Sequence, residues 1–347
     1  MRTLFLEALQ GKEISTTPLW MMRQAGRYLP EYRKVRRQFS DFMQMCKTPE
    51  ACCQVALQPL DRFDLDAGIV FSDILTVPEA MGLPLRFVEG QGPVFDSPVK
   101  NITDIKKLDA INSIERLNYV MEAVSLTKQT LSNRLPLIGF CGSPWTIAAY
   151  MVEGKTSKQF NKLRKMMYSA PSVLHSLLIK LTTVTEEYLL AQIKAGADAI
   201  MIFDTWGGLL SAENYPLFSL DYMKKIIQAI KALYASIPVI LFTKGGGLWL
   251  DKILQSGADG IGIDWTISIE NARNIVKDKV TLQGNLDPAA LYGDDKSIRL
   301  AVKNMLSAEA NNSRYVYNLG HGIYPDIDPD KVQVMVDAVR EFGQKMR

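Results

Sequence analysis

The chain has 347 residues, of which 47% are hydrophobic and 22% charged, and its formal net charge is +3. This length and composition suit one large α/β barrel or two medium-sized globular domains. The small net charge argues against a general nucleic-acid-binding protein, and no apolar run approaches the roughly 20 residues that a membrane span needs. We therefore expect neither a nucleic-acid partner nor a membrane partner.

The N-terminal segment and the cysteines indicate a cytoplasmic protein. Glu7 and Gln10 interrupt the first apolar patch, which predicts a short amphipathic helix and not a secretory signal. Four cysteines occur without C-x-x-C spacing: Cys46, Cys52, Cys53 and Cys141. We interpret them as reduced thiols. The only histidines are His175 and His321, and so few and poorly spaced ligands predict no metal site.

Eight short apolar runs recur along the chain, each ending in a polar or glycine-rich turn. They span residues 18–24, 67–73, 136–142, 198–204, 238–244, 259–265, 280–285 and 314–320. Their near-continuous apolar character is typical of parallel strands that are buried on both faces. The longer segments between them, such as 157–195 and 213–235, have the apolar spacing of helices.

Eight strand–helix units predict a single (β/α)8 TIM barrel over residues 1–347, with a deep cleft at the C-terminal ends of the strands. The alternative is a doubly wound open sheet. No G-x-G-x-x-G follows the first run, which weakens a dinucleotide-binding version of that fold.

Positive charge is concentrated in residues 22–37, MRQAGRYLPEYRKVRR. Arg23 lies at the end of the first predicted strand and Arg27 follows it, and Gly26 permits a tight turn that aims both side chains across the barrel mouth. The remaining cations fall on a helix that Pro30 could begin, and we interpret them as a solvated face or a set of ion pairs: Arg33, Lys34, Arg36 and Arg37.

Residues that follow the other strands are further candidates, because active sites of such barrels lie at the strand ends. Asp73 ends the second run, while Tyr150 comes after the third, Thr205 after the fourth and His321 after the eighth. Asp73 could equally cap a helix, and Tyr150 could be a core tyrosine. His321 is harder to explain as structural, because a histidine between two glycines buries little. The sequence TKGGG at 243–247 could cradle a phosphate at a helix start or simply form a flexible loop.

Four blocks in this order carry a resemblance to a known family: PLWMMRQAGRYLPEYR, GIVFSDILTVPEAMG, GFCGSPWTIAAYMVEG and YNLGHGIYPDIDPD. They resemble the uroporphyrinogen decarboxylase family of haem biosynthesis, over essentially the whole chain. The resemblance implies a single (β/α)8 barrel, a homodimer and no cofactor. It also implies removal of four CO2 from the acetate side chains of uroporphyrinogen III, which yields coproporphyrinogen III.

The resemblance also assigns site residues. It places catalytic roles on Asp73, Arg27 and Arg23, with Asp73 as the pyrrole-binding aspartate. The substrate-binding positions are Arg23, Gln24, Arg27, Asp73, Phe140, Tyr150, Thr205 and His321. Some family members have serine where this chain has Thr205, so the hydroxyl is retained.

The chemistry of the implied substrate accounts for the local basic cluster. An octacarboxylate needs positive charge where it docks, and the planar fork of arginine grips carboxylates better than lysine does. In the alternative interpretation, Arg23 and Arg27 pair with internal acids such as Asp73. The proton donor stays open among Arg23, Arg27, Tyr150 and His321, and we favour Tyr150 and His321 as substrate positioners.

Three other functions remain in view. Corrinoid-linked methyltransferases share this barrel, but they bind zinc through a His-x-Cys element that neither histidine offers. A non-catalytic tetrapyrrole carrier would keep the arginines and have no need for Asp73. A phosphate-binding barrel enzyme would use TKGGG and would not need two arginines after the first strand.

Overall fold

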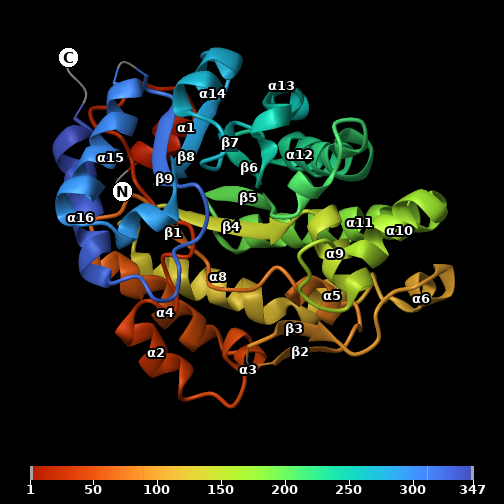
Figure 1. Ribbon diagram of the computed structural model, residues 1–347. Coiled ribbons are helices and arrows are strands. Elements are labelled where there is room, and N and C mark those ends of the chain that lie inside the picture. Colours follow the sequence, from red (N-terminus) through yellow and green to blue (C-terminus); the bar gives the residue numbers. More distant parts are fainter. Residues whose placement is uncertain (1–2, 89, 311, 345–347) are drawn as a thin grey trace.

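The computed structural model describes residues 3–88, 90–310 and 312–344, and it has an α/β fold built on one curled parallel sheet (Figure 1). The sheet has seven strands, which are neighbours in chain order. They are β1 (Gly68–Ile69), β4 (Leu137–Gly142), β5 (Ala199–Asp204), β6 (Val239–Thr243), β7 (Gly260–Gly262), β8 (Thr281–Leu286) and β9 (Tyr315–Leu319). All neighbouring pairs are parallel, so their carboxyl ends meet at one edge.

Seven of the eight predicted runs form these strands, because helices cover the outer face while apolar side chains fill the inner face. Every residue of β4, β5 and β6 is buried. Such strands read as continuous apolar runs in the sequence and not as alternating ones.

The first predicted run forms only an isolated bridge. Leu19 pairs in parallel with Tyr317 of β9, whose N–H donates to the Pro18 carbonyl oxygen at 2.8 Å. On its other side, Leu19 accepts from the Asp66 N–H at 2.7 Å. Residues 18–20 therefore lie between β9 and Asp66, two residues before β1. The pairing stays short because the chain soon leaves the extended conformation, with φ of +62° at Arg23.

Helices form the outer layer, and neighbouring ones contact each other around the sheet. The larger ones are α4 (Pro49–Arg62), α8 (Asn118–Leu131), α9 (Pro144–Glu153), α10 (Asn161–Ser169), α11 (Pro171–Ala195), α12 (Asp221–Leu233), α14 (Ile269–Val276), α15 (Asp295–Ala308) and α16 (Pro329–Phe342). The shorter ones are α1 (Leu4–Leu9), α2 (Pro30–Arg36), α3 (Phe42–Cys46), α5 (Thr76–Ala80), α6 (Ile102–Lys107), α7 (Ser113–Arg116) and α13 (Leu250–Ile253). None of the described helices combines the length and apolar character of a membrane span.

Several helix predictions are confirmed and one needs correction. The N-terminal helix α1 forms, and Pro30 begins α2. The segment 157–195 contains two helices, because Pro171 excludes the helical conformation at Ala170, where φ is −148° and ψ is 55°. The segment 213–235 begins with a π-helical turn over Pro216–Leu220 before α12.

A hairpin of β2 (Leu85–Val88) and β3 (Gly92–Phe95) was not among the predicted elements. Its residues alternate poorly between apolar and polar side chains, so the sequence carries little strand signal. The Phe95 N–H donates to the Gly154 carbonyl oxygen at 2.8 Å, which ties the hairpin to the end of α9.

Candidate active site

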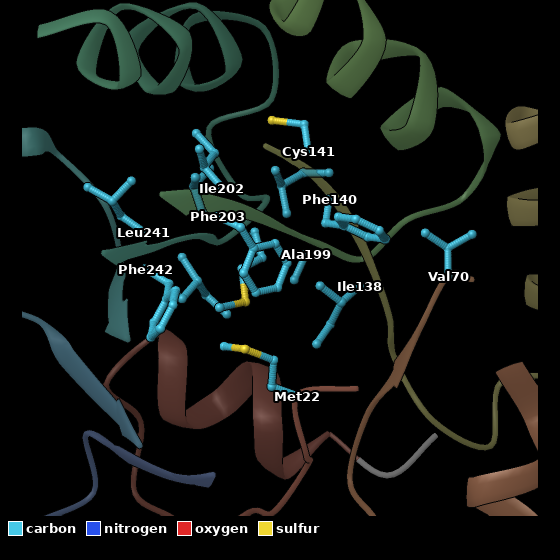
Figure 2. Packing of buried hydrophobic residues seen from close by; sticks show 14 of the residues in the cluster. Met22, Val70, Ile138, Phe140, Cys141, Ala199, Ile202, Phe203, Leu241 and Phe242 are labelled. Atoms are coloured by element: carbon cyan, nitrogen blue, oxygen red, sulfur yellow. The ribbon is translucent and has the colours of Figure 1, made fainter. Parts of the chain in front are cut away.

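Aromatic rings line the inner face of the sheet near its carboxyl edge. Phe140 of β4 contacts Phe203 of β5 with ring centroids 5.6 Å apart, and Phe203 contacts Phe242 of β6 at 6.2 Å. Figure 2 shows these three rings in one buried cluster together with Met22. The row continues to His321, whose ring centroid is 6.0 Å from that of Phe242. The predicted residues Phe140 and His321 are thereby joined through three neighbouring strands.

Asp73 lies just beyond β1, and one of its two carboxylate oxygens accepts a hydrogen bond from a nearby residue of the chain. Oδ1 accepts from the Leu75 N–H at 2.8 Å, while Oδ2 accepts no hydrogen bond from the described residues. Burial raises the pKa of the Asp73 carboxyl above its usual value, and the Leu75 N–H and the charge of Arg23 offset part of this effect. The carboxyl therefore organises the turn before α5 and still has one oxygen available for a ligand.

Arg23 is the charged residue that links the predicted positions. Its side chain lies directly over Gly322, where any Cβ would collide with it, so this glycine makes room for the arginine beside His321. The charge of Arg23 also lowers the pKa values of Asp73 and His321. The charge of Arg23 thus acts on three candidates from three other parts of the sequence: Asp73, Tyr150 and His321.

Arg27 is exposed and lies in a turn that other side chains hold in place. Arg33 donates from Nη1 to the Arg27 and Tyr28 carbonyl oxygens at 2.8 and 3.1 Å. Arg33 therefore braces the turn, where the sequence predicted a solvated or ion-paired side chain. Neither Arg23 nor Arg27 forms an ion pair with a described residue, so the internal pairing with Asp73 that the sequence left open is not observed.

Gln24 lies between these two arginines, but its side chain points into the protein. It has no exposed surface, its Oε1 accepts from the Met21 N–H at 3.2 Å, and its Nε2 donates to the Ala67 carbonyl oxygen at 3.2 Å. These bonds tie the arginine-bearing turn to the residue that precedes β1. A direct contact between Gln24 and a substrate stays a prediction.

His321 is held in its neutral form. Burial lowers the pKa of the imidazole to about 3, and the nearby charges of Arg23 and Lys244 act in the same direction. A neutral imidazole can donate from one ring nitrogen and accept at the other, but it carries no readily released proton near neutral pH. This electrostatic environment suits a residue that positions a ligand.

Tyr150 and Thr205 occupy neighbouring structures at the same edge. Tyr150, in α9, packs its ring 6.2 Å from Trp206 and 5.7 Å from Phe160. Burial raises the pKa of the Tyr150 hydroxyl, and the negative charge of Asp73 raises it further. Because its pKa is raised, Tyr150 is a neutral hydrogen-bonding group near pH 7. Thr205 is half-buried and directly precedes Trp206 at the end of β5.

Asp204, which ends β5, is a structural carboxyl that the sequence did not distinguish from Asp73. Its Oδ1 accepts from the Ser143 and Thr146 hydroxyls at 2.6 and 2.9 Å, and its Oδ2 accepts from the Ser219 hydroxyl at 2.7 Å. Thr146 in turn accepts from the Trp206 N–H at 3.1 Å. Asp204 thereby fixes the start of α9 relative to the turn that carries Thr205.

Lys244 is the residue near the site that sequence reasoning missed as a candidate. It follows β6 in the TKGGG segment, and its charge reaches His321. Its position as the last residue of the predicted run 238–244 was the signal that could have found it. Among the described residues, no three His, Cys, Asp or Glu side chains are grouped as a metal site would require.

Comparisons with known proteins show the family of this chain. The family profile described as "Uroporphyrinogen decarboxylase (URO-D)" matches residues 1–342. The chain belongs to the uroporphyrinogen decarboxylase family. A uroporphyrinogen decarboxylase from Francisella tularensis subsp. novicida is 55% identical over 99% of this chain and 100% of its own length. One from Ruthia magnifica is 51% identical over 98% of this chain and 99% of its own length.

A solved structure shows how far the fold extends beyond uroporphyrinogen decarboxylases. A methyltransferase from Methanosarcina mazei superposes with a TM-score of 0.82 over 98% of both chains, at 20% identity. At that identity the likeness concerns the fold alone.

Proposed function

We propose that this chain is a uroporphyrinogen decarboxylase, a carboxy-lyase that converts uroporphyrinogen III to coproporphyrinogen III in porphyrin biosynthesis. The match to the family profile and the full-length relatives support this function. The structural observation that carries it is the environment of Asp73, whose free carboxylate oxygen lies within the influence of the unpaired Arg23.

The two arginines provide the positive charge that an octacarboxylate substrate requires. Arg23 and Arg27 are exposed and form no ion pair with a described residue, so binding a carboxylate would not first require breaking an internal pair. Guanidinium groups bind carboxylates through two parallel hydrogen bonds. We assign both arginines to the acidic side chains of the porphyrinogen.

The substrate itself supplies the electron sink for decarboxylation. Protonation of a pyrrole α-carbon gives an iminium-like cation, and cleavage of the adjacent CH2–CO2⁻ bond sends its electron pair into that cation. Protonation of the resulting methylene gives a methyl group, and loss of the first proton from the α-carbon restores the neutral pyrrole. A propionate has one further CH2 and cannot conjugate in this way, so it survives. This chemistry needs no cofactor.

In this scheme Asp73 accepts hydrogen bonds from the pyrrole N–H groups and stabilises the positive charge of the protonated ring. Its free Oδ2 is the acceptor for the first role, and its ionised form serves the second. Arg23 favours that ionised form by lowering the pKa of the carboxyl. Arg23 or Arg27 could deliver the proton through water or from an adjacent carboxyl.

His321 and Tyr150 position the substrate in our proposal, because both are neutral near pH 7. Thr205 and Phe140 complete the binding surface. His321→Asn keeps a hydrogen-bonding group and should weaken binding more than it slows the chemical step. Loss of the chemical step with unchanged binding would instead identify His321 as an acid.

The finer architecture is also part of the proposal. We count residues 18–20 as the eighth strand of a closed (β/α)8 barrel, supported by their hydrogen bonds to Tyr317 and Asp66. Residues 1–347 would form one domain that acts as a homodimer, as the family resemblance implies. The four free, buried cysteines support a reducing compartment such as the cytoplasm.

The direct test is anaerobic incubation of chelator-treated protein with uroporphyrinogen III, followed by oxidation and separation of the products by carboxyl number. We expect a progression from eight carboxyls to four that the chelator does not affect. Return of the octacarboxylate unchanged, although it binds, would favour the carrier. Loss of activity that an added metal ion restores would contradict the cofactor-free scheme.

A further inference from the structure

Hydrogen bonds from two consecutive backbone N–H groups fix the loop at Lys244. The Lys244 N–H donates to the Asp204 carbonyl oxygen at 3.2 Å, which continues the pairing of β6 with β5 by one residue. The next N–H, of Gly245, donates to the Asp264 Oδ2 at 2.6 Å. A Cβ at Gly208 would lie 2.5 Å from the Lys244 carbonyl oxygen, so this glycine permits the close approach. The loop thus presents the lysine from a fixed base.

The direction of the Lys244 side chain follows from its place after β6. Alternate residues of a strand face the same side, so Lys244 shares the inner face with Phe242 and not the outer face of Thr243. The Thr243 hydroxyl contacts the Tyr215 hydroxyl at 2.8 Å on that outer side, whereas the Phe242 ring lies 6.0 Å from His321. Lys244 therefore extends from the edge of the site.

The ammonium group of Lys244 has no anionic partner among the described residues. Lys244 is half-buried and forms neither an ion pair nor a side-chain hydrogen bond with a described residue. The charges of Arg23 and Lys244 both reach His321, but only that of Arg23 is among the effects on Asp73. A partly desolvated cation without a partner is costly unless a ligand supplies the anion.

We propose that Lys244 binds a propionate carboxylate of the porphyrinogen, one that does not react in the cycle. This inference rests on the proposed function. A cation that gripped the departing CO2⁻ would stabilise the ground state more than the transition state, in which that charge moves into the ring. Arg23 acts on Asp73 as well as on His321, whereas Lys244 acts on His321 alone, so Lys244 is the cation that can hold a spectator group while Asp73 serves the reacting pyrrole.

Lysine also suits a ligand that must be presented several times. Four acetates react in turn, so the carboxylate opposite Lys244 changes its exact placement between cycles. A flexible ammonium tolerates such displacement, while the rigid guanidinium fork binds one geometry best. The site would then combine arginines that orient the substrate with a lysine that follows it.

The test compares Lys244→Met and Lys244→Arg with the control Lys296→Met, an exposed lysine in the outer helix α15 that has no ion pair with a described residue. We would measure kcat and KM for uroporphyrinogen III, the Kd of coproporphyrinogen III under anaerobic conditions, and thermal unfolding. For Lys244→Met we expect KM and the product Kd to rise about 10-fold or more while kcat changes less than about 2-fold. Lys244→Arg should recover most of the affinity, and the control should match the parent protein.

Three outcomes would overturn the proposal. Unchanged KM and Kd in a folded Lys244→Met variant would remove Lys244 from the site. Weaker uroporphyrinogen binding with an unchanged product Kd would mean that Lys244 contacts an acetate, since the product has lost its acetates. A fall in kcat alone would place Lys244 in the chemical step. If the parent protein does not turn over, the proposed function fails, while the product Kd still reports on Lys244.

Discussion

Asp73 lies just beyond β1 and Asp204 is the last residue of β5, and the two differ mainly in how their oxygens are used. Burial raises the pKa of both carboxyls. Three hydroxyls donate to Asp204, which has no exposed surface. Asp73 remains half-buried, its side chain accepts one backbone N–H from the described residues, and the charge of Arg23 acts on it.

The difference shows what separates a structural acid from a candidate catalyst in this fold. A carboxyl whose hydrogen-bonding capacity is already filled can only hold its neighbours in place. A carboxyl with an unused oxygen near a cation can accept a new donor and respond to charge on a ligand. Asp73 and Asp204 are the same residue type and lie near the carboxyl end of a strand, so these two properties do not distinguish them.

The largest expected effect comes from Asp73→Asn. The variant should fold, since the amide oxygen can still accept from the Leu75 N–H. Turnover of uroporphyrinogen III should fall by about 1,000-fold, because a neutral amide cannot offset the positive charge of the protonated pyrrole. Product formation per enzyme, measured beside the thermal unfolding midpoint, tests this. Near-normal turnover would remove Asp73 from the mechanism.

Asp204→Asn should have the opposite effect to Asp73→Asn, because it should lower stability and largely spare turnover. The amide replaces one acceptor oxygen with a donor, so at least one hydroxyl contact must rearrange in a buried network. We expect a loss of about 1–3 kcal/mol in the free energy of unfolding, with turnover within about 10-fold of the parent protein. Urea unfolding and steady-state kinetics measure the two effects. A loss of turnover as large as that of Asp73→Asn, without loss of stability, would contradict the structural assignment.

The dependence of stability on pH sharpens the same comparison. The pKa values of Asp73 and Asp204 are raised above the ordinary value of 3.8, so the folded protein binds more protons than the unfolded chain as the pH rises above 3.8. Both groups therefore make stability fall with rising pH in that window. Each Asp→Asn variant should show a shallower fall in unfolding midpoint across a pH series than the parent protein. If a variant shows the same dependence of the unfolding midpoint on pH as the parent protein, the carboxyl that it replaces has the same pKa in the folded and unfolded chain.

The smallest effect is expected for Ser219→Ala, which removes one of the hydroxyls that bind Asp204. The Ser219 hydroxyl donates to the Asp204 Oδ2 at 2.7 Å. Ser219 follows Asp204 in the sequence, whereas the other two donors, Ser143 and Thr146, precede it. Its loss should cost about 1 kcal/mol of stability and leave KM for uroporphyrinogen III unchanged. A shift in KM would show that the Asp204 network reaches the substrate directly, which would weaken the contrast with Asp73.

The sequence by itself determined the α/β class, seven of the strands and the family. Parallel strands buried on both faces must be apolar throughout, so runs such as 198–204 were recognisable without knowledge of their neighbours. The long blocks that resemble the family, from PLWMMRQ to GHGIYPD, likewise lie within continuous sequence.

Only the tertiary structure decided how individual polar residues are used. Asp73 and Asp204 both lie near the carboxyl end of a strand. The hydrogen-bond donors of Asp204 come from distant parts of the sequence, such as Ser143 and Ser219. Gln24 is turned inward by contacts with Ala67, and Lys244 is brought beside His321 across the sheet. Burial, free hydrogen-bonding capacity and nearby charge depend on such distant neighbours, and a linear pattern of residue types does not contain them.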